Sequence, residues 1–110
     1  MNFKIIPTEY FMQKVRELKK DYPSIRHDLK ELTDLLHQNP KSGTPLGSKA
    51  YKIRLKNSDL KKGKSGGYRV ITYVIDEIQN IRLLTIYAKP HKATITDKEI
   101  MTILKNENII

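Results

Sequence analysis

The spacing of apolar residues changes partway along the chain, and no other feature restricts the fold as strongly. Before residue 40, apolar side chains recur every three or four residues, as they do on one face of a helix. After residue 50 they alternate with polar residues or fill short runs, as they do in strands. A chain that changes its period in this way predicts an α+β fold, with its main helices and its sheet built from separate stretches.

The patterns predict four strands and three helices in the order β-α-α-β-β-β-α. Tyr22-Pro23 separates the first two helices, because proline restricts the residue before it and suits a new first turn. Two helices joined so closely should form a hairpin with their apolar sides toward one sheet. Thr96 and Glu99 have the spacing of a capping box that opens the last helix. The expected strands are 3–6, 51–55, 68–76 and 81–88, and the expected helices are 9–20, 23–38 and 97–104.

These elements predict a helical hairpin and a short C-terminal helix packed on a small, mainly antiparallel, twisted four-stranded sheet. The last two strands are apolar at most positions, so both faces of the sheet should be at least partly covered. Ile100, Ile103 and Leu104 form the expected buried side of the last helix. The chain has 110 residues without an internal repeat, and we expect one domain over residues 1–110.

The charge balance favours a polyanionic partner. Lysine and arginine together number 21, against 12 aspartates and glutamates, which gives a net charge of +9. Between Lys49 and Arg69 the basic residues concentrate, and Asp59 is the single acid there. Such a field attracts nucleic acid, although basic surfaces also serve solubility alone. The basic residues of this segment are Lys49, Lys52, Arg54, Lys56, Lys61, Lys62, Lys64 and Arg69.

Several other classes of protein are disfavoured by composition. The chain has no cysteine, and its three histidines lack metal-ligand spacing, so we expect no metal site and no cofactor. No apolar run is long enough to cross a membrane, and the first residues do not resemble a signal peptide. We therefore expect a cytoplasmic protein that has no membrane partner.

The segment from Lys56 to Gly67 resembles a phosphate-binding loop only superficially. Gly63-Lys64-Ser65 lacks the required glycine five positions earlier, where Ser58 stands, and it leads into a strand instead of a helix. The segment is then either a solvated insertion or a set of lysines that contact phosphates, and the residues alone leave both open. Its candidate RNA-binding residues are Lys56, Lys61, Lys62 and Lys64.

Several motifs together resemble the RelE/ParE toxin superfamily of type II toxin–antitoxin systems, and the RelE- and HigB-like branch is the nearest. The motifs are Tyr51-Lys-Ile-Arg-Leu55, the basic Gly/Lys/Ser-rich segment between Lys56 and Gly67 (the basic loop), Gly66-Gly-Tyr-Arg-Val-Ile-Thr-Tyr73, Leu83-Leu-Thr-Ile-Tyr-Ala-Lys89 and Thr96-Asp-Lys-Glu-Ile100. With the paired helices before the sheet, the resemblance covers nearly the whole chain.

The resemblance implies a toxin that cleaves messenger RNA in the ribosomal A site without a metal ion. The 2′-hydroxyl attacks the scissile phosphate, and an antitoxin protein, mRNA and the ribosome with its rRNA are the implied partners. Lys52 and Arg54 match the basic pair of the family's strand, and Arg69 matches the arginine of the next one. Arg54 and Arg69 suit phosphate contacts because they stay charged. Lys52, which lies among several cations, is the better candidate for the base.

The proton donor is less well defined by the resemblance. RelE has an arginine soon after its last strand and a tyrosine farther on, where this chain has Pro90 and Thr96. The substitutes nearby are Tyr87, Lys89, His91 and Lys92. We take Tyr87 and His91 as catalytic candidates, since imidazole is the natural acid–base group near neutral pH and HigB-like toxins carry a histidine near this end. Lys89 and Lys92 are candidates for RNA binding.

Two other functions remain open on the sequence. A ParE-like toxin of the same fold would inhibit DNA gyrase without nuclease activity, although the cluster of Lys52, Arg54 and Arg69 argues against it. A noncatalytic RNA- or ribosome-binding module would need only the charge. For the ribonuclease toxin, we expect an acidic antitoxin that either covers Lys52, Arg54 and Arg69 or blocks entry to the ribosome. The helix at 97–104 is the expected contact, unless it only completes the core.

Overall fold

The structure is a computed structural model that describes residues 2–61, 66–92 and 94–110. Within these ranges the α+β class and the predicted elements are confirmed, with one additional strand. The elements are β1 (Lys4–Pro7), α1 (Glu9–Lys19), α2 (Ile25–Gln38), β2 (Thr44–Gly47), β3 (Ala50–Leu55), β4 (Tyr68–Ile75), β5 (Asn80–Ala88) and α3 (Asp97–Asn106).

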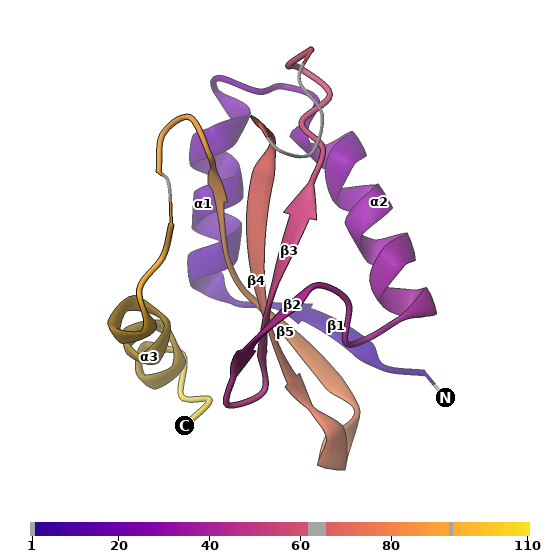
Figure 1. The fold of residues 1–110 in the computed structure, drawn as a ribbon, viewed down its shortest axis with the longest axis vertical. Coiled ribbons are helices and arrows are strands. Elements are labelled where there is room, and N and C mark those ends of the chain that lie inside the picture. The colour runs from indigo at the N-terminus through magenta and orange to yellow at the C-terminus, as the bar shows by residue number, and fades with distance from the viewer. Residues whose placement is uncertain (1, 62–65, 93) are drawn as a thin grey trace.

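The sheet has five strands in the order β1-β5-β4-β3-β2, so the prediction of four strands was wrong (Figure 1). Only the β1–β5 pair is parallel among the described pairings. The missed strand, β2, pairs with β3 at the edge of the sheet and contains Pro45. Proline and glycine are depleted in strands, which is why the sequence there predicts a loop. An edge position tolerates proline because one side of the strand needs no partner.

One face of the sheet is covered by the helical hairpin of α1 and α2. Thr8 fixes the start of α1, because its hydroxyl accepts a hydrogen bond from the Phe11 N–H at 3.0 Å and donates one to the Leu83 carbonyl of β5 at 2.9 Å. Helix α2 begins at Ile25, two residues after the predicted start. The two apolar stripes meet strand side chains in one buried cluster, as predicted. That cluster includes Phe11, Tyr22, Ile25, Leu32, Leu36, Ile53, Leu55, Tyr68, Val70, Ile81, Leu83, Ile86 and Ala88.

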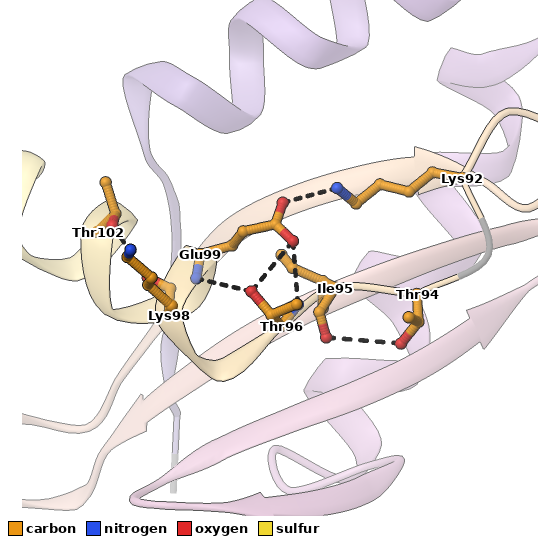
Figure 2. Close-up of polar contacts among 7 residues, drawn as sticks. All are labelled: Lys92, Thr94, Ile95, Thr96, Lys98, Glu99 and Thr102. Carbon is orange, nitrogen blue, oxygen red and sulfur yellow. Dashed lines mark hydrogen bonds and ion pairs between the residues drawn. The ribbon is translucent and has the colours of Figure 1, made fainter.

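The opposite face is covered by α3, which packs Ile100, Ile103 and Leu104 against Ile71 and Leu84. The predicted capping box is present at its start, where Thr96 and Glu99 exchange hydrogen bonds of 3.1 Å (Figure 2). At its end, the Glu107 carboxylate accepts a 3.1 Å hydrogen bond from the Glu9 N–H, at the N-terminus of α1. A carboxylate is favourable there because the first N–H groups of a helix carry partial positive charge.

Three connections meet at one end of the sheet: the α1–α2 turn, the β3–β4 connection and the exit from β5 (Figure 1). The Asp59 carboxylate accepts a 2.9 Å hydrogen bond from the Ser24 N–H, and the buried Asp28 carboxylate accepts one of 3.0 Å from the Ser58 N–H. In the first bond the donor is at the start of α2 and the acceptor is in the basic loop, and in the second the donor is in the loop and the acceptor is in α2. They hold the described part of that loop against the helical hairpin.

Gly67 directly precedes β4, at a point where the backbone of β3 passes very close. A Cβ atom at this position would lie 2.3 Å from the Leu55 carbonyl oxygen, so the second glycine of the Gly66-Gly67-Tyr68 motif is required by contact with β3. Its own carbonyl accepts the Lys89 N–H at 3.1 Å. The glycine therefore brings β3, β4 and the exit of β5 together. None of the helices among the described residues is long and apolar enough to cross a membrane.

Candidate functional site

Strand register places three of the predicted site residues in one row across the sheet. Arg54 of β3 lies directly opposite Arg69 of β4, and Arg69 lies directly opposite Tyr87 of β5. Their strand neighbours belong to the cluster under the helical hairpin. Because side chains alternate along a strand, the row faces the other side of the sheet, the side of α3. We call Arg54, Arg69 and Tyr87 the arginine row.

Lys52 lies on the same face of the sheet, two residues before Arg54 in β3. It is opposite Ile71, which packs in the cluster under α3. Lys52 is partly exposed and Arg54 is exposed. Within the part of the chain that the structure describes, neither forms an ion pair. The shared strand face expected from the Lys-x-Arg spacing is therefore present, and both cations can reach a ligand.

Arg69 and Tyr87 lie deeper in this sheet face than Arg54 does. Arg69 is 5% exposed and Tyr87 is 7% exposed, whereas Arg54 is exposed. The Arg69 guanidinium donates a 3.1 Å hydrogen bond to the Tyr68 carbonyl. Burial raises the pKa of the Tyr87 phenol, and Arg69 and Lys92 oppose part of that rise. The row thus has an accessible end at Arg54 and a buried end at Tyr87.

The pairing of Arg54 with Arg69 places two positive charges directly opposite each other on neighbouring strands, about 4.8 Å apart. Arg54 is exposed and Arg69 is buried, so Arg54 is the guanidinium that can reach an anion, and Arg69 adds positive charge beside it. Such an arrangement suits a phosphate, which accepts charge-assisted hydrogen bonds from arginine.

His91 lies beyond the end of β5, where Tyr22 holds it. The Tyr22 hydroxyl and the His91 Nε2 atom are 2.9 Å apart, and the two rings meet edge to face with centroids 5.9 Å apart. Tyr22 also packs edge to face on Tyr68, again at 5.9 Å. Tyr22 is buried while His91 is exposed. The imidazole is therefore anchored at one nitrogen and accessible from solvent.

The two lysines that follow β5, Lys89 and Lys92, differ in their contacts. Lys92 forms a 2.6 Å ion pair with Glu99, the capping residue of α3 (Figure 2). That hydrogen bond raises the pKa of Lys92 and lowers the pKa of Glu99. Lys92 must exchange this partner before it binds a phosphate, whereas Lys89 is exposed. In the basic loop, Lys56 and Lys61 are exposed, and the predicted contacts Lys62 and Lys64 lie outside the described residues.

A cavity of about 310 Å³ connects the buried end of the arginine row with His91. Tyr87, His91 and Lys92 line it together with residues of α1. It lies beside the part of β5 that follows Leu83, where the pairing with β1 ends. Among the described residues, no group of three or more His, Asp or Glu side chains is placed to hold a metal ion. The polar side chains at this site are those of lysine, arginine, tyrosine and histidine, together with the carboxylates of Glu17, Asp21 and Glu99 that line the cavity.

Sequence reasoning missed three residues that shape this site. In the sequence, Tyr22 stands out only as the residue before a proline, and no local pattern links it to His91. Glu99 was predicted as a helix cap, and its second role toward Lys92 depends on the path of the chain after β5. Asp59 offered a usable signal, because it is the single acid in the basic segment and it holds that segment against α2.

The fold and the basic row together define an α+β protein with one helix-covered sheet face and one face left partly open beside a C-terminal helix. No protein-family model matches the chain, and no curated protein matches it. Solved structures do. An arginine double mutant of the E. coli toxin RelE in the free state superposes with a TM-score of 0.61 at 20% identity, covering 100% of both chains. The chain therefore has the fold of the RelE toxin.

Two further structures agree with this fold. The isolated E. coli RelE toxin has a TM-score of 0.59 at 19% identity, covering 94% of this chain and 98% of that one. The double mutant in complex with a peptide of the antitoxin RelB has a TM-score of 0.55 at 23% identity, covering 86% and 97%. The resemblance predicted from the strand motifs is confirmed at the level of the fold.

Proposed function

We propose that this protein is the toxin of a type II toxin–antitoxin pair and a metal-independent endoribonuclease that cleaves mRNA in the ribosomal A site. One observation carries the proposal: Arg54 and Arg69 lie directly opposite each other on the sheet face that Lys52 shares. A phosphate accepts charge-assisted hydrogen bonds from arginine, and this sheet face presents Arg54 and Lys52 to solvent. The similarity of this fold to that of a known toxin supports the same function.

The side chains suit the cleavage of RNA by its own 2′-hydroxyl. Lys52 takes the 2′-proton, and Arg54 contacts the scissile phosphate, because it is the accessible arginine of the row. Arg69 adds a fixed charge from a buried position, where electrostatic interactions are stronger than in water. Tyr87 and His91, which line one cavity, are the candidates for protonating the 5′-oxygen.

The proposal is tested by removing the two accessible cations. We expect Lys52→Gln with Arg54→Gln to lower cleavage of mRNA on translating ribosomes by at least about 10²- to 10³-fold, the effect of losing one group that stabilises the transition state. Lys19→Gln with Lys20→Gln is the matched control, because it removes the same charge from an exposed stretch at the end of α1. Circular dichroism checks that both double variants are folded.

The outcome also separates the alternative functions. Wild-type toxicity with inhibited DNA supercoiling and no RNA cleavage would replace the proposal with a gyrase inhibitor. Ribosome binding that slows translation without cleaved message would leave only a binding module. Equal cleavage by the Lys52/Arg54 variant and the wild type would contradict the assignment of Lys52 and Arg54 to the catalytic site.

The lysines of the basic loop are proposed to bind phosphates without reading sequence. Neutralising Lys61, Lys62 and Lys64 should weaken ribosome binding and reduce its dependence on salt, because fewer counterions are released. The position of the cut should stay the same. A shifted cut would show that the loop contacts bases.

The antitoxin partner is also part of the proposal. The basic face is suited to an acidic segment that covers Lys52 and Arg54, or to one that contacts α3. The solved complex of RelE with a RelB peptide shows that a protein of this fold binds an antitoxin segment. Hydrogen exchange of the toxin with its genomic neighbour tests the idea, and protection on neither the basic face nor α3 would contradict it.

A further inference from the structure

We propose that Tyr22 is a positioning residue that holds Nε2 of His91, so that Nδ1 of His91 delivers the proton to the leaving 5′-oxygen. The inference rests on the proposed ribonuclease function and assigns its general acid. Tyr22 belongs to the turn between α1 and α2, and its hydroxyl reaches a residue 69 positions later in the chain, at 2.9 Å.

Tyr22 is itself held in place, as an orienting group must be. It is 8% exposed and packs edge to face on Tyr68, which is fully buried under the hairpin. The next residue is Pro23, whose ring restricts the backbone of Tyr22. The phenol thus has little freedom, and its hydroxyl stands at a fixed point above the end of β5. His91 follows from that strand through a turn in which its N–H bonds the Ala88 carbonyl at 2.9 Å.

The contact leaves one imidazole nitrogen for chemistry. Nε2 is bound to Tyr22, and within the described residues no hydrogen bond to Nδ1 is formed. The ring is exposed and lines the same cavity as Tyr87, at the buried end of the arginine row. The charged groups around this cavity are Lys14 and Glu17 of α1, Asp21 of the α1–α2 turn, Lys92 after β5 and Glu99 of α3.

The proton transfers balance without rearranging the contact. In the imidazolium form, Nε2–H donates to the Tyr22 oxygen and Nδ1–H points away from it. The 2′-oxygen forms a bond to phosphorus and gives its proton to the neutral amine form of Lys52, while the bond from phosphorus to the 5′-oxygen breaks. That oxygen takes the proton from Nδ1, which leaves neutral His91 with Nε2–H still bound to Tyr22. Solvent then restores both protonation states.

The contact can be tested without any RNA. The Nε2 nitrogen resonance of His91 should shift in Tyr22→Phe, because a hydrogen bond to that nitrogen is lost. The resonances of His27 and His37 should stay unchanged, which makes them internal controls. Tyr73→Phe is the matched variant, since it removes a phenolic hydroxyl farther along β4. An unchanged His91 resonance in Tyr22→Phe would overturn the inference.

The role in catalysis is tested with two substrates. On ordinary RNA, we expect His91→Ala to lose about 10²- to 10⁴-fold in cleavage rate, and Tyr22→Phe about 10- to 100-fold. The double variant should be no slower than His91→Ala, because the two residues act as one unit. With sulfur in place of the bridging 5′-oxygen at the mapped cut site, the leaving group needs no proton. Both single variants should then approach the wild-type rate.

The outcomes distinguish the two proposals. If the wild type cleaves RNA and Tyr22→Phe cleaves it equally fast, only the role of Tyr22 is overturned. A loss that persists with the sulfur substrate would mean that Tyr22 supports the structure alone, and it would also overturn the inference. If the wild type does not cleave RNA on ribosomes at all, the proposed function fails, and the assignment of a general acid fails with it.

Discussion

The two faces of the sheet are built for different tasks. The hairpin face is covered by α1 and α2 over a continuous apolar cluster, and buried residues come from both helices and from β3, β4 and β5. The opposite face is covered only in part, by α3 and a smaller cluster. The arginine row and Lys52 lie on that second face. Stability is concentrated on one side of the sheet and charge on the other.

The difference explains how a small protein can carry an unfavourable charge arrangement. A sheet of five strands that packs one face against two helices gains most of its stability from apolar burial there. The opposite strand surface can then place like charges in register, at a cost of a few tenths of a kcal/mol to about 1 kcal/mol for a directly opposed pair. Four predictions test this separation, beginning with the largest effect.

Removing a core side chain should cost more on the hairpin face than under α3. Leu32 is 1% exposed between helix and sheet, and we expect Leu32→Ala to lower the free energy of unfolding by about 2–5 kcal/mol, through lost burial and the cavity left behind. Ile103→Ala, at 7% exposure on α3, should fall at the lower end of that range. Urea unfolding measures both. Equal losses would show that the two faces stabilise the fold equally.

One tyrosine on each face should respond differently to alkaline pH. Burial raises the pKa of both Tyr68 and Tyr87, but Asp28 and Asp59 add to the rise at Tyr68, whereas Arg69 and Lys92 oppose it at Tyr87. A raised pKa in the folded state means full stability below the unfolded value of about 10, and loss above it of about 1.4 kcal/mol per pH unit.

Tyr68→Phe should therefore remove more of the alkaline loss of stability than Tyr87→Phe. Unfolding curves between about pH 9 and 12 measure the loss, and phenolate absorbance assigns the group that titrates. A larger effect of Tyr87→Phe would mean that Arg69 and Lys92 do not offset the rise in pKa that burial causes at Tyr87.

The start of α3 is held by its capping box, and the N-cap should be worth about 1 kcal/mol. Thr96→Ala removes the oxygen that accepts the Glu99 N–H, and it should increase amide exchange in the first turn of α3. Thr102→Ala is the control, since its hydroxyl bonds only the Lys98 carbonyl within the helix, at 2.9 Å (Figure 2). Equal effects of the two variants would contradict a specific capping role.

The smallest effect has the opposite sign. Arg54→Gln should leave stability unchanged or raise it by about 0.2–1 kcal/mol, because it removes the like charge opposite Arg69. The gain should shrink as salt increases, since ions screen the exposed side chain. The same variant should lower RNA cleavage. A clear loss of stability at low salt would mean that Arg54 has a supporting contact and that the row is not a strained anion site.

Local patterns in the sequence were enough to predict the class of fold and most of its elements. Helical spacing, the turn at Tyr22-Pro23 and the capping box at Thr96 depend on neighbours within one or two turns, and so they can be read from the chain. The same applies to Lys52 and Arg54, because strand alternation alone places them on one face. The resemblance built on these strands also predicted the fold correctly.

Only the tertiary structure decided how distant residues meet. The register that aligns Arg54, Arg69 and Tyr87 depends on how three strands pack, and a shift by one residue would turn each side chain to the other face. Strand β2 exists because β3 offers it an edge, against the preferences of Pro45 and Gly47. The contact of Tyr22 with His91 spans 69 positions, and no local pattern encodes it, since it depends on two turns meeting at the end of the folded sheet.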